Sequence, residues 1–168
     1  GVSGIMFPKV STPDEAAKLV ARTRFENGAR GFSLSHRAAG YGAMTQEQFL
    51  RHNDSGLLRA VQIEDVDGVA NTESIAMTDG VDLIFVGPAD LAVSISASSP
   101  HLGDIESETA KVVDAAASAD TAAGIYLPNL NNIEKYIGLG FTFFVMSTDQ
   151  QILSAGANSL ATEFKKFT

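Results

Sequence analysis

The chain has no cysteine and is poor in basic residues. Without cysteine it can hold no disulfide, no thiol nucleophile and no zinc ion bound by thiolates. Its 12 Lys and Arg stand against 20 Asp and Glu, a formal net charge of −8 at pH 7 that repels nucleic acid and anionic membranes. No apolar run is long enough to span a bilayer. We therefore expect a cytoplasmic globular protein that has neither nucleic acid nor a membrane as its partner.

The start of the sequence also lacks the basic and apolar segments of a secretory signal. The chain begins with Gly1 instead of methionine and enters a strand-like apolar run at Ile5. Because native N-termini seldom open so abruptly, we expect further sequence to precede Gly1.

Apolar strand-like runs alternate with helix-like segments along the whole chain. Five strands are predicted, near Ile5, Val61, Ile84, Ile125 and Phe144. Helices are predicted over residues 13–24, 45–52, 66–77, 104–119, 130–139 and 149–164. The glycine-rich segment 28–42 is expected to be a loop with a brief strand near Arg30. This alternation predicts a parallel sheet covered by helices.

Helix-start and helix-stop signals support these boundaries. Thr12 with Glu15, and Thr45 with Gln48, have the spacing of capping boxes, in which each side chain bonds the other residue's backbone amide. Gly140 follows a predicted helix and is typical of a helix stop.

Two architectures fit a parallel sheet of this kind, an open doubly wound sheet and a (β/α)8 barrel. The glycine fingerprint of a dinucleotide-binding fold is missing, because Gly138 and Gly140 lie at a helix end ahead of a strand, the reverse of the required order. A barrel takes ~250 residues, or about 31 for each strand–helix unit. The 168 residues therefore hold about five units, which favours a barrel and leaves the open sheet as an alternative.

Polar side chains stand where two neighbouring predicted strands end. Gln62 and Glu64 are two residues apart, so they share one face of their strand. The next strand runs into a predicted turn, Gly-Pro-Ala-Asp, that ends at Asp90. Active sites of parallel α/β folds form at the C-terminal ends of the strands, and adjacent strands lie about 4.8 Å apart. We therefore expect Asp90 to come close to Glu64.

Two adjacent carboxylates repel each other unless a proton or a cation lies between them. Oxygen ligands without cysteine or an evident histidine favour Mg²⁺ or Mn²⁺ over zinc. Each residue also has a simpler interpretation. Glu64 would be a solvated rim residue, Asp90 a cap for a helix beginning at Leu91, and Gln62 a hydrogen-bonding core residue. Their combination at neighbouring strand ends is more telling than any one of them, and spacing alone leaves both the metal site and the simpler interpretations open.

Other polar residues are assigned to structural or surface roles. These include the three histidines, His36, His52 and His101, and also Lys9, which follows a strand end. The Ser/Pro segment 96–103 is expected to be a loop long enough to act as a lid or an interface segment.

The motif Gln-Ile-Glu at residues 62–64, followed by Phe-Val-Gly-Pro-Ala-Asp-Leu at 85–91, resembles the HpcH/HpaI aldolase/citrate lyase family. Within that family it is most similar to the 2-keto-3-deoxy sugar acid and 4-hydroxy-2-oxoheptanedioate aldolase branch. Similar segments cover nearly the whole chain, at residues 5–10, 21–25, 30–31, 124–125, 139–143 and 147–149. The resemblance implies a (β/α)8 TIM barrel of the phosphoenolpyruvate/pyruvate type. Residues 1–168 would form a single partial barrel domain with strands four to eight and without strands one to three.

The resemblance also implies a class II aldolase or lyase that cleaves or forms a 2-keto acid, from pyruvate or an oxaloacetate-like acid and an aldehyde. Glu64 and Asp90 match the family's catalytic metal ligands, for Mg²⁺ or Mn²⁺ with Co²⁺ possible, and the ion would carry a pyruvate enolate. The matching substrate-binding positions are Gln62, Gly87, Pro88 and Ala89. By resemblance the protein is a homo-oligomer, because hexamers of helix-swapped dimers are common in the family.

Several departures from the family pattern keep alternatives open. The chain lacks the family's histidine with its acidic partner, used in proton transfer, and the arginine that holds the keto acid. Asp65 stands where the family often has threonine and is expected to bring another carboxylate near the ion. One alternative is an enolate-using enzyme of the same fold that forms carbon–carbon bonds or decarboxylates. The other is a non-catalytic truncated barrel that acts as a subunit or scaffold, since five strands leave two exposed sheet edges.

Overall fold

A single parallel sheet forms the centre of the molecule. The computed structural model of the chain describes residues 1–98 and 103–167. The strands follow one another across the sheet in chain order: β1 Gly4–Phe7, β2 Leu58–Ile63, β3 Leu83–Val86, β4 Ala122–Leu127 and β5 Phe143–Met146. All four neighbouring pairs are parallel. Strand order therefore never reverses, as it does at the switch point of a doubly wound sheet.

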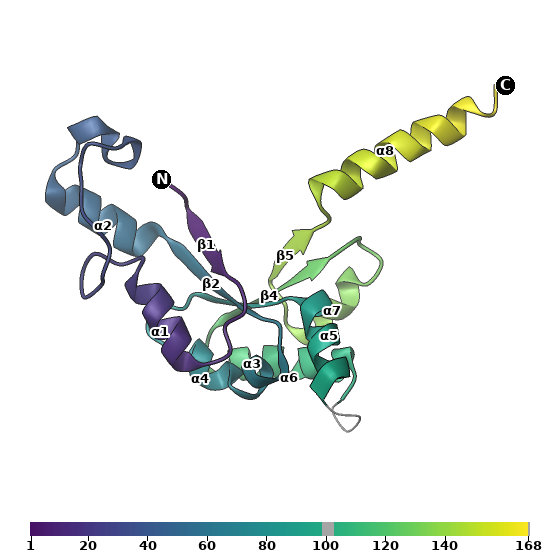
Figure 1. Cartoon of the computed structure of the whole chain (residues 1–168), viewed down its shortest axis with the longest axis horizontal. Coiled ribbons are helices and arrows are strands. Elements are labelled where there is room, and N and C mark those ends of the chain that lie inside the picture. Colours follow the sequence, from purple (N-terminus) through teal and green to yellow (C-terminus); the bar gives the residue numbers. More distant parts are fainter. Residues whose placement is uncertain (99–102, 168) are drawn as a thin grey trace.

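The sheet curls into part of a barrel (Figure 1). Helices α3, α4 and α6 cover its convex face, and β1 and β5 form its two free edges within the described residues. The predicted barrel-type α/β fold is confirmed, and each of the predicted strands is present.

Most predicted helices are also present. The structure contains α1 Pro13–Ala21, the 3₁₀ segment η1 Arg37–Gly42, α2 Gln46–Gly56, α3 Val66–Ala70, α4 Thr72–Ala76, α5 Pro88–Ser98, α6 Ile105–Ser118, α7 Ile133–Leu139 and α8 Asp149–Phe164. The capping boxes predicted at Thr12 and Thr45 both form. Gly140 ends α7 in the left-handed conformation (φ 106°), which glycine adopts without steric cost.

The described residues differ from the sequence-based prediction in three places. The helix predicted over 66–77 is broken at Asn71 into α3 and α4. The segment near Arg30 contains no strand. Residues 88–98 form α5, where a turn followed by the start of a loop was expected. The rest of that expected loop, with His101, lies outside the described residues. Proline is favoured in the first turn of a helix, which explains why α5 begins at Pro88.

The hydrophobic core lies between the convex face of the sheet and the helices. Outward-facing strand residues such as Val61, Ile84 and Ile125 are at most 1% exposed and pack against α1, α4 and α6. The opposite, concave face carries the alternate residues, including Gln62 on β2 and Phe85 on β3. Because side chains alternate along a strand, membership of one set in the core under the helices assigns the other set to the concave face.

Helix α8 extends away from the sheet (Figure 1). The face that the sequence predicts, with Leu153, Ala157, Leu160 and Phe164, is exposed throughout. Among the described helices, none combines the length and apolar composition needed to cross a membrane.

Candidate functional site

Gln62 and Glu64 lie side by side at the C-terminal end of β2. Val61 and Ile63 are fully buried toward the helices, which turns the two polar side chains to the concave face. The Gln62 Nε2 donates a hydrogen bond to the Glu64 Oε2. The amide therefore holds one carboxylate oxygen in place and leaves the other available to a ligand.

Gly87 forms the floor beneath these side chains. It follows β3 directly, and its N–H donates to the Ile63 carbonyl oxygen over 3.1 Å. A Cβ at this position would lie 2.6 Å from the Gln62 Nε2 and 2.6 Å from the Glu64 Oε2. A Cβ here would push the ends of both flexible side chains aside, so the present placement of the Gln62–Glu64 pair depends on glycine.

Asp90 projects from the first turn of α5. The helix begins at Pro88, and the fully buried Leu91 anchors it through an N–H bond of 3.0 Å to the Gly87 carbonyl oxygen. The interpretation of Asp90 as the cap of a helix starting at Leu91 is therefore wrong, because Asp90 lies inside the helix. The predicted positions Gly87, Pro88 and Ala89 all belong to the junction between β3 and this first turn.

The junction between β3 and α5 can attract an anion at one point and a cation at another. The free amides and the positive dipole end of α5 attract an anion. Among the described residues, no Lys or Arg forms an ion pair with Glu64 or Asp90. The two carboxylates are thus uncompensated by protein cations, and they present hard oxygen atoms to a cation.

This donor set fits a hard divalent ion. In the part of the chain that the structure describes, no three or more His, Asp or Glu side chains are grouped so that they could hold an ion by themselves. Mg²⁺ usually binds through one or two carboxylates and fills its remaining positions with water and substrate oxygens. The residues present therefore agree with a Mg²⁺- or Mn²⁺-type site that is completed by its ligand.

Asp65 does not add a carboxylate to this group. Its Oδ1 accepts from the Gly68 N–H at 2.7 Å and caps α3, and its Oδ2 accepts from the Ser11 hydroxyl at 2.6 Å. Both oxygens thus bind groups on the helix-covered side of β2. The expectation that Asp65 lies near the ion is wrong, because local capping takes its side chain away from Glu64.

Tyr126, on β4, is a concave-face residue that sequence reasoning missed. Its neighbours Ile125 and Leu127 are buried in the core, so its side chain lies on the same face as Glu64. Its hydroxyl donates to the Gln151 Oε1, at the start of α8, over 2.9 Å. The alternation of residues 125–127 carried the signal that could have found it.

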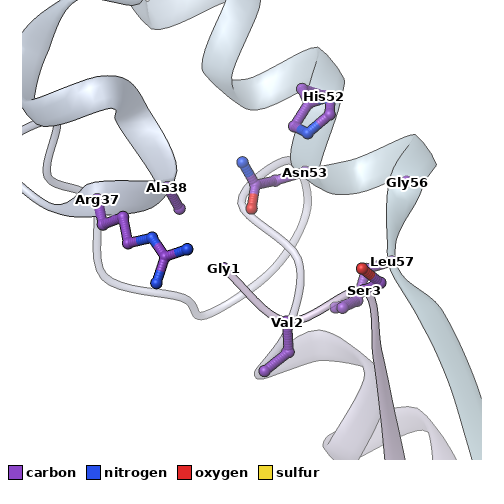
Figure 2. Close-up of a pocket in the computed structure, with 9 residues that line it drawn as sticks. All are labelled: Gly1, Val2, Ser3, Arg37, Ala38, His52, Asn53, Gly56 and Leu57. Carbon is purple, nitrogen blue, oxygen red and sulfur yellow. The ribbon is translucent and has the colours of Figure 1, made fainter.

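The other polar residues singled out from the sequence lie elsewhere. The His36 ring contacts the Phe49 ring, with 5.1 Å between centroids. His52 lines a cavity of about 540 Å³ together with Arg37 and Asn53 (Figure 2). That cavity adjoins the segments leading into β1 and β2, at the opposite end of the sheet from Glu64. Lys9 is exposed just after β1.

Comparison with known proteins identifies what the chain resembles. The family model for HpcH/HpaI aldolase/citrate lyase matches residues 1–155. A hydroxypyruvate/pyruvate aldolase from Paraburkholderia phytofirmans is 36% identical over 159 residues, which cover 89% of this chain and 59% of the relative. A 5-keto-4-deoxy-D-glucarate aldolase from Salmonella arizonae is 36% identical, with 99% of this chain and 65% of the relative covered. The chain thus spans about three fifths to two thirds of the length of these relatives.

Solved structures agree on the fold. A HpcH/HpaI aldolase/citrate lyase family protein from Burkholderia cenocepacia superposes with a TM-score of 0.85 at 35% identity, covering 98% of this chain and 66% of the other. The protein CitE from Mycobacterium tuberculosis, solved in complex with magnesium and pyruvate, has a TM-score of 0.55 at 15% identity. The superposition covers 90% of this chain and 55% of CitE, and at this identity the likeness concerns the fold alone.

Proposed function

The chain belongs to the HpcH/HpaI aldolase/citrate lyase family, and we propose that it carries the metal-binding half of a class II aldolase site that acts on a 2-keto acid. The observation that carries the proposal is the Gln62–Glu64 pair lying across Gly87, against the first turn of α5. The reaction is cleavage or formation of the bond between pyruvate and an aldehyde, through the enolate of pyruvate.

Each residue of the junction has a role in this proposal. Glu64 and Asp90 hold the divalent ion, Mg²⁺ or Mn²⁺ with Co²⁺ as a further candidate, and Gln62 orients the Glu64 carboxylate through its amide. The bound ion supplies Lewis-acid stabilisation of the negative charge that develops on the keto acid. Within residues 87–89, the Ala89 N–H is the backbone donor left for the carboxylate of the keto acid, because the Gly87 N–H already binds the Ile63 carbonyl oxygen and Pro88 has no N–H. The α5 N-terminus favours an anion there without having to move.

The relatives support this choice of ligands. Two of them are named as aldolases of hydroxypyruvate/pyruvate and of 5-keto-4-deoxy-D-glucarate. A structural neighbour was solved with magnesium and pyruvate. A small 2-keto acid, an aldehyde and a hard divalent ion are therefore the proposed partners. The proposed location of the protein is the cytoplasm.

We also propose that the protein is a homo-oligomer that buries α8. Leu153, Leu160 and Phe164 are between 66% and 75% exposed along one face of this helix. An apolar helix face that the described residues leave this exposed gains free energy when it is covered. A second copy of the chain is the proposed occupant, in line with the oligomers that the family resemblance implies.

The metal site is tested by removing one ligand. Glu64→Gln keeps the size of the side chain and removes its charge. We expect Mn²⁺ affinity, measured by isothermal titration, to fall by at least about 100-fold, since even changes outside the ligand shell cost 10- to 100-fold. Glu134→Gln, at an exposed position in α7, is the matched control and should bind as the parent does.

The activity is tested with the same proteins in a retro-aldol assay that traps pyruvate, with and without EDTA. We expect turnover that EDTA abolishes and that Mg²⁺ or Mn²⁺ restores. Equal Mn²⁺ affinity of Glu64→Gln and the parent would refute the site. Metal binding without any turnover would favour the alternative of a non-catalytic subunit.

A further inference from the structure

Glu64, Gly87 and Tyr126 form a row across the concave face of the sheet. Ile63 pairs with Val86, and Val86 pairs with Ile125. Continuing this register by one residue places Glu64, Gly87 and Tyr126 side by side, since all three strands are parallel. Two strand spacings put about 10 Å between the first and the last of the three backbones.

The middle member of this row has no side chain. The Glu64 carboxylate already lies over Gly87, where a Cβ would collide with it. Because Gly87 has no side chain, none stands between the Glu64 carboxylate and Tyr126 in this row, and a small ligand bound at Glu64 can extend toward Tyr126. One level below this row, the Phe85 and Phe143 rings lie beside Gln62 on the concave face, with 6.3 Å between their centroids, so this level is largely apolar on the side of Tyr126.

One hydrogen bond fixes the direction of the phenol, and two more hold its acceptor in place. The Gln151 Oε1 accepts from the Tyr126 hydroxyl at 2.9 Å, from the Ser147 hydroxyl at 3.1 Å and from the Thr148 N–H at 3.1 Å. Gln151 is itself fixed, because it is the partner of Thr148 in the capping box of α8. The phenol proton is committed to Gln151, so what the Tyr126 oxygen offers to a ligand is a lone pair.

We infer that Tyr126 is a specificity-determining residue of the proposed aldolase site, whose phenol oxygen accepts a hydrogen bond from a hydroxyl group on the aldehyde portion of the substrate. The substrate class is then a 2-hydroxyaldehyde in place of a simple alkyl aldehyde. The inference rests on the proposed function for the location of the keto acid. It also makes Gln151 a positioning residue, because it acts on the substrate only through Tyr126.

The experiment compares two aldehydes that differ in one hydroxyl group. Aldol addition of pyruvate to glycolaldehyde and to acetaldehyde is measured with Mn²⁺ in the parent protein and in Tyr126→Phe. One neutral hydrogen bond is worth about threefold to tenfold in binding. We expect the ratio of kcat/KM for glycolaldehyde over acetaldehyde to fall by that factor in Tyr126→Phe, with the KM for pyruvate unchanged.

Matched variants separate this role from a structural one. Tyr136→Phe makes the same change on α7, outside the concave face, and should keep the parent's ratio. Gln151→Ala should lower the ratio, because the hydroxyl of Tyr126 loses the acceptor that fixes the direction of its proton and so of its lone pairs. Gln151→Glu should retain it, because a carboxylate accepts the same three hydrogen bonds. If Tyr126 serves only to fix α8, Tyr126→Phe changes thermal stability while the aldehyde ratio stays at the parent's value, and the inference is overturned.

A binding measurement covers the case in which the protein has no turnover. With ¹³C-labelled tyrosine, the Tyr126 Cζ resonance is followed by NMR while glycolaldehyde or acetaldehyde is added with Mg²⁺ and pyruvate present. We expect glycolaldehyde to shift the Tyr126 signal and acetaldehyde to shift it less, with the Tyr136 signal unmoved. A Tyr126 signal that responds to neither aldehyde overturns the inference. Failure of the proposed function is read separately, from EDTA sensitivity and from Mn²⁺ binding by Glu64→Gln.

Discussion

At the residue scale, the geometry of the proposed site depends most directly on Gly87. Its φ lies outside the left-handed region that favours glycine, so backbone conformation does not require glycine here. The requirement comes from space alone, because the side chains of Gln62 and Glu64 occupy the volume of a Cβ. A residue without a side chain thus determines where a carboxylate can lie.

Gly87→Ala tests this dependence. The added methyl group must displace Gln62 and Glu64, so we expect Mn²⁺ affinity to fall by 10-fold or more, in the range typical for residues that orient metal ligands. The free energy of unfolding should change little, because the two nearest atoms that must move are the ends of flexible side chains. Gly138→Ala is the control, since a Cβ there meets nothing within 4 Å. Unchanged metal affinity in Gly87→Ala would contradict the assigned geometry.

Asp65 gives a second prediction at this scale. Its side chain caps α3 and binds Ser11, so Asp65→Ala should lower the free energy of unfolding by about 1 kcal/mol, the usual cost of losing an N-cap. Mn²⁺ affinity should stay at the parent value, because Asp65 lies outside the proposed site. Asp67→Ala, an exposed change in the same helix, is the reference for urea unfolding. A large loss of metal affinity in Asp65→Ala would show that the Asp65 carboxylate does act on the ion, against this assignment.

At the element scale, side-chain contacts join the helices to the turns between strands. The guanidinium of Arg24, after α1, pairs with the carboxylate of Asp79 in the turn before β3. The hydrogen bond and the positive charge of Arg24 hold the pKa of Asp79 below its ordinary value of 3.8. A carboxyl group with a depressed folded-state pKa stabilises the protein above its unfolded-state pKa, and this contribution is lost as the pH falls through the folded value.

Asp79→Asn should therefore unfold at a lower urea concentration than the parent at pH 7. The gap should close as the pH drops below 3.8, where the parent's carboxyl group also becomes protonated. The effect should be small and sensitive to salt, because the Asp79 side chain is 90% exposed. Asp114→Asn, at an exposed position of α6, should show no such pH-dependent gap. A gap that widens toward low pH would contradict the assigned pairing.

At the scale of the whole molecule, the outstanding feature is that the sheet and α8 each leave an apolar surface uncovered. On the concave face, Leu58, Phe143 and Val145 are each more than a third exposed. Helix α8 has a well-formed capping box and yet no buried residue. Propensity and capping suffice to start this helix, but in proteins most helical stability comes from packing of an apolar face. A partner surface for α8 is therefore expected on energetic grounds.

Leu160→Glu tests the proposal that a second copy supplies this surface. A charge in a buried apolar contact is costly, so we expect the oligomer to dissociate at micromolar concentration. Sedimentation velocity measures this directly. Thr162→Glu lies on the opposite side of α8 and should leave the oligomer intact. A parent protein that sediments as a monomer at all concentrations would refute the proposal.

The sequence by itself determined the order of the elements and the identity of the candidate ligands. The strands near Ile5, Val61, Ile84, Ile125 and Phe144 were predictable because buried parallel strands are short, apolar and bounded by turn residues. The capping boxes at Thr12 and Thr45 were predictable because they depend on residues only three positions apart. The Gln62–Glu64 pair was predictable from alternation along a single strand. All of these are local properties.

Only the tertiary structure decided which polar groups come together. The sequence did not reveal that α5 begins at Pro88, that Asp65 turns to Ser11, or that Tyr126 reaches Gln151. Each of these contacts depends on strand register or on the path of another segment, and register follows from the packing of the whole sheet. Alternation can assign a residue to a face, but it cannot say which residue of the next strand lies beside it, because that depends on which apolar residues the helices bury.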